Sequence, residues 1–449
     1  MTLEQQAGTS SPAHDPAVLR QAREAIEGCL DTAAMRDLVL DRVRRNEEWR
    51  GRRCVNLVAA EAPTSPLVRR VLSSEAGTRA SGGAIGRDRR WFSAMAVLDE
   101  LEALCVELLK RAFACSFADP RLLGGMHATM VAYTALAAPG DTVLVLGPEG
   151  GGDSSHTAEG PPAARGVRLA PIPVDASGLD IDLDRFAEVA GRLRPPLVAL
   201  GQTTTLFPLP VTEIREIIGE WGGRLYVDAA HQAGLVAGGA YPDPLAQGAD
   251  LVTASSGKTF CGPQGGFALW NDPALAEAVS HTIFPVLTGS HQLNRVAALA
   301  VATTEVLEYG ADLAAGMVRN ARCLAAALHE RGVPVLGAGR GFTSTHQVLV
   351  DARGWGGGFA AASRLAEANL VVNQQPLPGR DDTAFPGGVR LGTAEVTRLG
   401  MGTAEMARIA GFLAAVLRDG ADPATVREEV VRFREPFQTV YYCHESGRP

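Results

Sequence analysis

Short apolar runs alternate with amphipathic stretches through the middle of this 449-residue chain. The runs are separated by segments whose apolar residues have helical spacing, for example residues 212–221. Strands that are apolar on both faces and alternate with helices predict a mostly parallel sheet covered by helices, an α/β fold. Ligands of such sheets bind at the carboxyl ends of the strands. The clearest runs are DTVLVLG, VRLAPIPV, PLVALG, GRLYVDAA, ADLVTAS and GGFALW.

The segments on either side of these apolar runs have other patterns. Together the patterns divide the chain into three predicted parts. Residues 17–50 contain no proline and are rich in Ala, Leu, Arg and Glu, and residues 292–331 have a long helical pattern. After the second helical stretch, strands near HQVLVDA, NLVVNQQ and GVRLGT alternate with helices. The predicted parts are a tail and helical arm (1–54), a large domain (55–305) and a smaller C-terminal α+β domain (306–449).

Composition narrows the class of protein. The chain is 46% hydrophobic and 20% charged, and no apolar run approaches the roughly 18 residues that span a membrane. A net charge of -8 argues against nucleic acid or an anionic membrane surface as the main partner. The polar N-terminus lacks the features of a signal peptide, so we expect a cytoplasmic protein. Seven scattered cysteines suggest neither disulfides nor a zinc site.

Lysine is scarce: of 42 basic residues, only Lys110 and Lys258 are lysines. Arginine would serve for a generic charge, whereas a lysine amine can become neutral when buried and attack a carbonyl to form a Schiff base. Lys258 lies between the strand LVTAS and the loop GPQGG. Asp228 ends a strand thirty residues earlier, and His231 follows. An aspartate there could pair with a pyridoxal phosphate ring nitrogen, cap a helix, or share a metal with His231, for which no third ligand is evident.

Five segments resemble the serine hydroxymethyltransferase family of fold-type I pyridoxal phosphate enzymes, over residues 56–402. They are NLVAAE, YTALAAPGD, VDAAHQAGLVAGG, GKTFCGPQGG and GVRLGTAEVTRLG. The resemblance implies a pyridoxal phosphate cofactor, with Lys258 as the Schiff-base lysine and Asp228 as partner of the pyridine nitrogen. It places His231 near the phenolic oxygen of the cofactor, and Thr203 where a serine hydrogen-bonds that oxygen.

The same resemblance implies the remaining site residues and a homodimer with shared active sites. Gly124, Gly125 and Met126 match the phosphate loop, and Ser256 lies beside the cofactor lysine. Gly289 and Ser290 match a segment that reaches the phosphate from the neighbouring subunit. Arg390 matches the arginine that grips the carboxylate of an amino-acid substrate, for which a forked guanidinium is suited. Ala60 and Phe92 are further candidates for substrate contact.

The chain departs from the family pattern at the site. Asp153 stands where the family has a ring-stacking histidine, with His156 three residues later, so what covers the cofactor ring is open. Gly257 replaces the histidine before the lysine, and Met126 replaces a phosphate-binding serine. The segment ASGGAIGRDRRWFSA contains three arginines that could bind the phosphate instead or form a solvated turn.

Two further departures concern the reaction. The family's Tyr-Ala-Glu segment, whose glutamate serves folate-linked transfer, is Gly82-Gly83-Ala84, and the tyrosine pair that follows it is Trp91-Phe92. A serine that contacts the substrate carboxylate is replaced by Ala60. The glycines either widen the entrance or reflect a rebuilt loop.

Loss of the glutamate argues against ordinary hydroxymethyl transfer and favours an offshoot found in antibiotic pathways. The leading hypothesis is an enzyme of the lincosamide type that acts on an S-linked cysteine conjugate. It would expel the thiol by β-elimination or lose the carboxylate with oxygen as oxidant. The alternatives are a threonine transaldolase or other retro-aldol enzyme, whose ring-stacking histidine and His-Lys-Thr motif this chain lacks, and a non-catalytic binding protein.

Overall fold

The first part of the chain forms a compact helical unit. The computed structural model describes residues 14–86, 88–379 and 385–449, and the chain divides into units 1–54 and 55–449. The first unit contains α1 (Pro16–Glu27), α2 (Thr32–Glu48) and η2 (Trp49–Arg53). The carboxylates of Asp15 and Asp31 cap α1 and α2 by accepting hydrogen bonds from backbone N–H groups. The stretch predicted as helix over 17–50 is therefore two helices, because a second cap begins a new helix.

A seven-stranded sheet forms the centre of the second unit, in the order β2-β8-β7-β6-β5-β3-β4. The register is parallel from β4 to β7, and β8 is antiparallel to both β7 and β2. This confirms the mostly parallel sheet predicted from the apolar runs. The strands are β2 (Phe117–Asp119), β3 (Thr142–Val145), β4 (Arg168–Pro171), β5 (Leu197–Gly201), β6 (Arg224–Asp228), β7 (Leu251–Ser255) and β8 (Gly266–Trp270).

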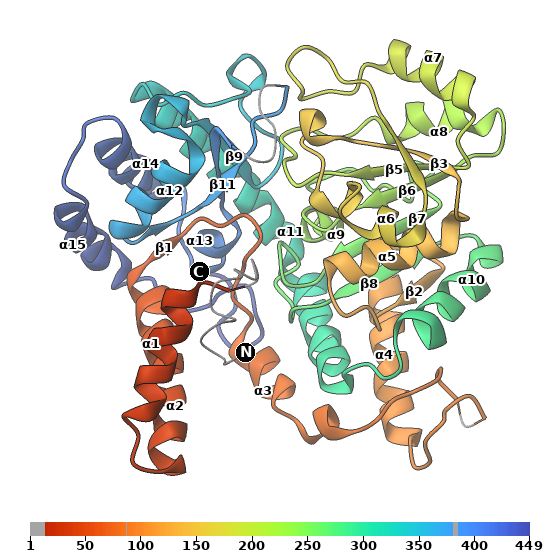
Figure 1. The fold of residues 1–449 in the computed structure, drawn as a ribbon, viewed down its shortest axis with the longest axis horizontal. Helices are drawn as coiled ribbons and strands as arrows, with labels where there is room; N and C mark the ends of the chain where they lie inside the picture. Colours follow the sequence, from red (N-terminus) through yellow and green to blue (C-terminus); the bar gives the residue numbers. More distant parts are fainter. Residues whose placement is uncertain (1–13, 87, 380–384) are drawn as a thin grey trace, which may run out of the picture. The chain divides into compact units, whose positions relative to one another are not determined.

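Helices cover both faces of this sheet (Figure 1). Side chains alternate along each strand, so Leu197 and Ala199 of β5 pack in one core with α5 and α10, while Val198 and Leu200 pack in another with α4, α7 and α8. The covering and connecting helices are α3 (Pro66–Leu72), α4 (Ala96–Phe113), α5 (Gly125–Leu136), α6 (Pro161–Arg165), α7 (Leu183–Leu193), α8 (Val211–Gly219), α9 (Ala233–Ala237) and α10 (Ala276–His281). Short helical turns are η3 (Glu75–Thr78), η4 (Pro148–Gly150), η5 (Ser154–His156), η6 (Pro273–Leu275) and η7 (Thr282–Leu287).

The 38-residue helix α11 (Leu293–Glu330) links the large sheet to the C-terminal elements (Figure 1). These form a three-stranded antiparallel sheet, β11-β12-β9, and the short parallel pair β1-β10. The predicted domain boundary at 305/306 falls inside α11 and stays a prediction. The strands are β1 (Val55–Asn56), β9 (Gln347–Asp351), β10 (Leu370–Val371), β11 (Asn373–Gln375) and β12 (Gly388–Gly392). The helices are η8 (Ala338–Arg340), η9 (Arg353–Trp355), α12 (Gly357–Glu367), α13 (Ala394–Arg398), α14 (Thr403–Leu417) and α15 (Pro423–Arg434).

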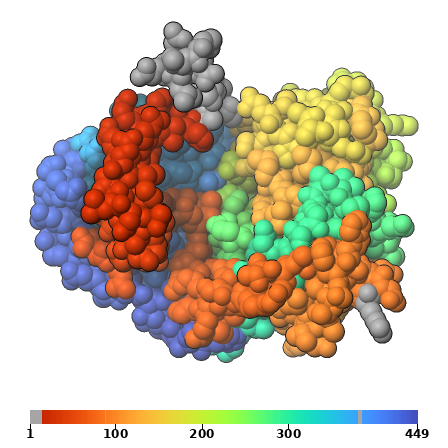
Figure 2. All heavy atoms as spheres, turned by 60° about the horizontal axis from the view of Figure 1, so that its bottom comes forward, coloured from red at the N-terminus to blue at the C-terminus, as the bar shows by residue number. Residues whose placement is uncertain are grey.

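The segment before α4 packs against the segment before α11. Residues 66–86 and 88–95, orange in Figure 2, lie beside the green segment of residues 276–291. The rings of Trp91 and Phe284 meet edge to face with centroids 5.7 Å apart, and the backbone N–H of Ser81 donates to Ser290 Oγ at 2.8 Å. Among the residues that the structure describes, no helix has the length and apolar content needed to cross a membrane.

A buried ion pair joins α11 to α13 and generates a test of the fold. Arg398 Nη2 lies 2.8 Å from Glu305 Oε2, and both side chains are 1% exposed. Glu305→Leu alone should lower the free energy of unfolding by about 3–5 kcal/mol, because it leaves the guanidinium buried without its carboxylate. The double variant Glu305→Leu/Arg398→Met should lose far less, since it buries no unpaired charge. Chemical denaturation of the variants measures this, and additive losses would contradict it.

Candidate active site

The carboxyl ends of β5, β6 and β7 bring the predicted site together. Gly201 pairs in register with Asp228, and Asp228 with Thr253. Lys258 follows the end of β7 by three residues. Because neighbouring parallel strands end at the same edge, residues far apart in sequence meet there. The strand register places Asp228 and the segment that leads to Lys258 at this edge.

Three hydrogen-bond partners from separate segments fix the carboxylate of Asp228. Its Oδ1 accepts from the N–H of Ala230 at 2.9 Å, and its Oδ2 accepts from Thr129 Oγ1 at 3.3 Å. The Nε2 atom of His156 lies 3.4 Å from the same Oδ2. His156 is 1% exposed, and its Nδ1 lies 3.0 Å from the Tyr133 hydroxyl. His156 is thus a buried partner of Asp228, held so that Tyr133 can donate to one ring nitrogen while the other donates to the carboxylate.

Asp153, at the position of the ring-stacking histidine, places a second carboxylate in the site. Its Oδ1 accepts a hydrogen bond from the N–H of Ser155 at 2.9 Å. Asp153 thereby caps the start of η5. Burial alone would raise the pKa of Asp153, but hydrogen bonds from Ser155 and the charge of Lys258 hold it below its usual value. Asp153 is therefore ionised at neutral pH and is a weak proton acceptor.

Lys258 is half-buried beside these carboxylates. Burial lowers the pKa of its amine, Asp228 and Asp153 act in the opposite direction, and the nearby cation Arg390 adds to the lowering. The net pKa lies below the usual value for lysine. A lysine with a lowered pKa has a larger neutral fraction and is a better nucleophile and base.

Arg390 of β12 is 5% exposed and points at the end of β5. Its Nη1 donates to the carbonyl of Thr203 and also to Thr203 Oγ1, at 2.7 Å from the latter. Its Nε and Nη2 each lie 3.4 Å from Asn373 Oδ1. Burial lowers its pKa to about 10. Among the residues described, no carboxylate forms an ion pair with it, so its charge is available for a ligand carboxylate. Thr203 is accordingly a partner of the arginine.

Two buried histidines stack near Lys258. The rings of His231 and His346 are 5.8 Å apart and inclined by 21°, and His346 Nε2 lies 3.0 Å from the carbonyl of Ala59. Burial lowers the pKa of His231 well below 6.5 and that of His346 to about 3, so both are neutral. Their Nδ1 atoms have no hydrogen-bond partner in the described parts of the chain. His346 was missed from the sequence, where a histidine at the start of a strand resembles any other buried histidine.

The predicted phosphate loop forms an open helix N-terminus. Gly124 precedes α5, and a Cβ added at Gly124 or Gly125 would meet no atom within 4 Å. The N–H groups of the first turn of α5 can therefore bind an anion. Met126 is 52% exposed there and offers no polar contact. Ser256 is fully buried, and its hydroxyl donates to the carbonyl of Pro263 at 2.5 Å, so it shapes the lysine loop.

The residues expected to act from another subunit lie at the surface. Gly289 and Ser290 are exposed. Phe92, predicted as a candidate for substrate contact, is 46% exposed. A Cβ at Gly82 would lie 3.1 Å from the carbonyl of Gly289 and 3.2 Å from the Phe92 ring, so these segments pack on one another. Ala60 is half-buried next to Ala59, near the histidine pair.

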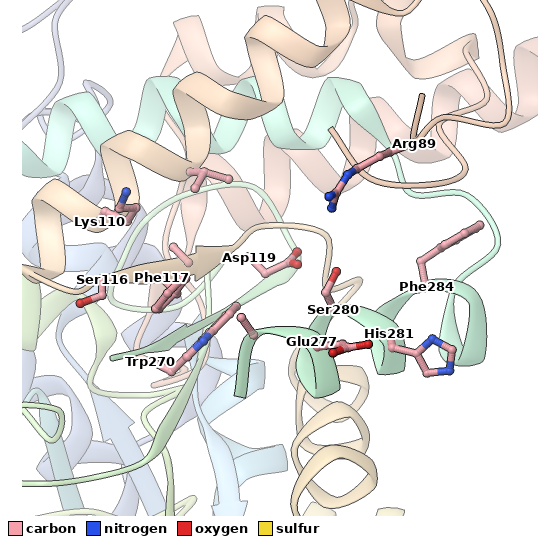
Figure 3. Close-up of a pocket in the computed structure, with 13 residues that line it drawn as sticks. Arg89, Lys110, Ser116, Phe117, Asp119, Trp270, Glu277, Ser280, His281 and Phe284 are labelled. Carbon is pink, nitrogen blue, oxygen red and sulfur yellow. The ribbon is translucent and has the colours of Figure 1, made fainter. Parts of the chain in front are cut away.

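Arg90 takes neither of the two roles considered for the arginine-rich loop, phosphate binding or a solvated turn. The Arg90 side chain is 1% exposed, with Nε 2.7 Å from Asp99 and Nη2 3.1 Å from Glu102, so its charge is already neutralised. Arg87 lies outside the described residues. Arg89 lines a cavity of about 810 Å³ between α4, β2 and α10, with Lys110 on its wall (Figure 3).

The backbone conformation of Gly83 explains why one of the glycines in the loop is needed. Its φ is +105°, and a Cβ would overlap the carbonyl of Arg89 across the bridge to Arg90. A glycine is needed there for the turn itself. At this position the structure favours a rebuilt loop over a widened entrance.

The residues present fit pyridoxal phosphate. A carboxylate held by three partners suits the ring nitrogen, a lysine with a lowered pKa suits the carbonyl, and the open start of α5 suits the phosphate. The unpartnered Nδ1 of His231 offers a further polar contact in the same site. No group of three or more His, Cys, Asp or Glu that could hold a metal ion occurs in the described ranges.

Comparison with known proteins agrees with this fit. Residues 34–413 match the family model described as serine hydroxymethyltransferase. Similar relatives are the serine hydroxymethyltransferases of Methanopyrus kandleri, 41% identical over 411 residues (91% of this chain, 95% of the relative), and Korarchaeum cryptofilum, 39% identical over 405 residues (87% and 93%).

A solved structure is also similar across the fold. The crystal structure of L-threonine transaldolase from Pseudomonas fluorescens in its internal aldimine state matches with a TM-score of 0.85 at 26% identity, covering 92% of this chain and 94% of that one. The chain therefore belongs to the serine hydroxymethyltransferase family and is a fold-type I enzyme that depends on pyridoxal phosphate.

Proposed function

We propose that this enzyme cleaves the carbon-sulfur bond of an S-linked cysteine conjugate by β-elimination, with a large sugar-derived group on sulfur as in lincosamide intermediates. Bound pyridoxal phosphate supplies the carbonyl that takes up the substrate amine and the electron sink for the α-carbon. Its ring nitrogen would pair with Asp228, and its phosphate would lie at the start of α5. Family membership favours catalysis over a binding protein on the same fold.

Arg390 and Lys258 would handle the substrate. The guanidinium of Arg390 binds the α-carboxylate, since it has hydrogen-bond partners but no ion pair among the described residues. A fixed carboxylate orients the α-carbon, so that the bond to be broken stands perpendicular to the cofactor ring. Lys258, with its lowered pKa, removes the α-proton.

The observation that carries the choice of reaction is the weakness of the other proton acceptors. The pKa values of Asp153, His231 and His346 are all lowered, which leaves Lys258 as the candidate base. Retro-aldol cleavage also requires a group that accepts the proton of the β-hydroxyl, and Ala84 stands where the family has its glutamate. Elimination needs only one base, because the departing thiolate can take up the proton.

The proposed reaction is balanced with water as the co-reactant. The α-carbon loses its proton, the bond from the β-carbon to sulfur breaks, and the sulfur leaves as a thiol. Hydrolysis of the remaining three-carbon enamine gives pyruvate and ammonium. The competing route on the same substrate breaks the carboxylate bond instead, consumes oxygen, and gives an S-linked aldehyde, carbon dioxide, ammonium and hydrogen peroxide.

Threonine transaldolase activity is the second candidate, and the structural similarity to the Pseudomonas fluorescens enzyme favours it. It would break the bond between the α- and β-carbons of threonine and join the α-carbon to another aldehyde. The replacement of the ring-stacking histidine by Asp153 weighs against it.

Product analysis tests the proposed reaction. The holoenzyme is incubated with an S-linked cysteine conjugate, and mass spectrometry should detect the free thiol with pyruvate. Lys258→Ala should lose turnover by about 100-fold or more and lose the visible absorbance of bound cofactor, because it removes both the base and the covalent link. An S-linked aldehyde with carbon dioxide would establish the oxidative route. Exchange of threonine's acetaldehyde for another aldehyde, without turnover of any thioether, would overturn the proposal in favour of the transaldolase.

Substitution of Arg390 tests carboxylate recognition. Arg390→Ala should raise KM for the amino acid by about 10- to 100-fold, the loss expected when charged hydrogen bonds are removed. Arg390→Lys should recover only part of this, because a lysine lacks the fork. Arg432→Ala, at an exposed position on α15, is the matched control and should leave KM unchanged. A KM that is equally unchanged in Arg390→Ala would place the carboxylate elsewhere.

We also propose a homodimer whose sites are completed across the interface. The exposure of Gly289 and Ser290, which match a segment that acts on the neighbouring subunit, supports this, and the helical arm of residues 14–54 would add to the interface. Light scattering of the active enzyme should give twice the 47.1 kDa chain mass. A fully active monomer would refute shared sites.

A further inference from the structure

His127, in the first turn of α5, has a hydrogen-bond partner at each ring nitrogen. The backbone N–H of Leu123 donates to its Nδ1 at 3.1 Å, and its Nε2 lies 3.2 Å from Thr288 Oγ1. The residue directly follows the predicted phosphate loop of residues 124–126, and Thr288 directly follows η7. One imidazole therefore connects the turn before α5 with a segment that lies 161 positions later in the chain.

These contacts fix which nitrogen of His127 carries the proton. A backbone N–H can only donate, so Nδ1 must offer its lone pair to Leu123 and the proton must be on Nε2. Burial lowers the pKa of His127 below its usual value, and hydrogen bonding to the backbone of Leu287 opposes this only in part. The ring is therefore neutral at neutral pH, and Nδ1 remains an acceptor while Nε2 donates to Thr288.

The start of α5 lacks an ordinary side-chain cap. Its N-cap residue is Gly124, which has no side chain to accept from the N–H groups of the first turn. His127 stands three residues after the cap, where the side chain of a capping box reaches back to the backbone N–H of the N-cap residue. Here the ring reaches one residue further, to Leu123. The side chain thus holds the chain in front of the helix and leaves the N–H groups of the first turn uncapped.

Hydrogen bonds hold the turn before α5 at both ends. The N–H of Gly266, the first residue of β8, donates to the carbonyl of Leu122 at 2.9 Å and ties one end to the sheet. The side chain of Leu123 is 39% exposed, so packing alone does not fix the other end. The bond from Leu123 to His127 does so, and Thr288, which is 6% exposed, keeps the ring in place.

We propose that His127 is a positioning residue of the cofactor site, which holds residues 123–125 so that the N–H groups at the start of α5 converge on the phosphate of pyridoxal phosphate. This inference rests on the placement of the phosphate at the start of α5 in the proposed function. His127 acts through the backbone of Leu123, and Thr288 orients its ring. A turn that is ordered before binding loses less conformational entropy when the ligand arrives, so the effect should appear in cofactor affinity.

Cofactor titration of a variant without ring nitrogens tests this role. His127→Phe keeps a flat ring but cannot accept from Leu123. The Kd of its full-length apoenzyme for pyridoxal phosphate should rise by about 3- to 10-fold, as expected for one hydrogen bond, with binding followed by visible absorbance. The Kd for pyridoxal, which lacks the phosphate, should stay as in the wild type. His281→Phe, at an exposed histidine that ends α10, is the matched control and should bind both like the wild type.

Two conservative variants separate the hydrogen bond from the shape of the ring. The amide oxygen of His127→Asn can accept from Leu123 in place of Nδ1, so this variant should recover most of the affinity for pyridoxal phosphate. Thr288→Val removes the partner of Nε2 and should give an intermediate Kd, and it keeps the test open if the phenylalanine variant does not fold. If His127→Asn binds as weakly as His127→Phe, ring packing causes the loss and the positioning role is wrong.

Amide exchange gives a readout that does not involve the cofactor. In apoenzyme, the peptide that contains Leu123 should exchange its hydrogens faster in His127→Phe than in the wild type, because the N–H has lost its acceptor. Unchanged exchange, or equal weakening of pyridoxal phosphate and pyridoxal binding, would overturn the inference. Faster exchange with an unchanged Kd for pyridoxal phosphate would instead refute the placement of the phosphate at the start of α5, together with the inference that rests on it.

Discussion

The site depends on one constraint: the carboxylate of Asp228 is fixed at the end of β6 by partners from three segments. Thr129 comes from α5, His156 from η5, and the backbone of Ala230 from the turn that follows the strand. Each partner is positioned by the sheet, because α5 and η5 both follow strands or loops at its carboxyl edge. A carboxylate held by three donors keeps one orientation, so it can pair with a ring nitrogen without first having to turn.

Burial sets the chemistry around this anchor. Desolvation disfavours charge on Lys258, His231 and His346 alike, but only the lysine is balanced by carboxylates, Asp228 and Asp153. One amine thus becomes a usable base while the two imidazoles remain neutral. Arg390 keeps its charge because even a pKa lowered to about 10 is far above neutrality.

Two departures from the family pattern remove polar side chains beside the cofactor site. Gly257 and Met126 have no side-chain hydrogen-bond donor at the positions that match a histidine and a serine of the family. The arginine-rich loop, by contrast, uses Arg90 internally, where Asp99 and Glu102 neutralise it.

The sequence by itself determined six of the seven strands of the large sheet, all but β2, and the long helix over residues 292–331. It also indicated that Asp228 and Lys258 lie at or just after the ends of strands. Apolar periodicity and residue scarcity are local properties, and the chain records them directly. Only the tertiary structure decided that His156 supports Asp228, that His346 stacks on His231, and that Asp99 and Glu102 neutralise Arg90. These depend on contacts between residues up to 115 positions apart, such as His231 and His346, and on the burial that those contacts create. Burial and hydrogen bonds between distant segments set the pKa values of the site residues. The local spacing of residues in the sequence does not reveal these contacts.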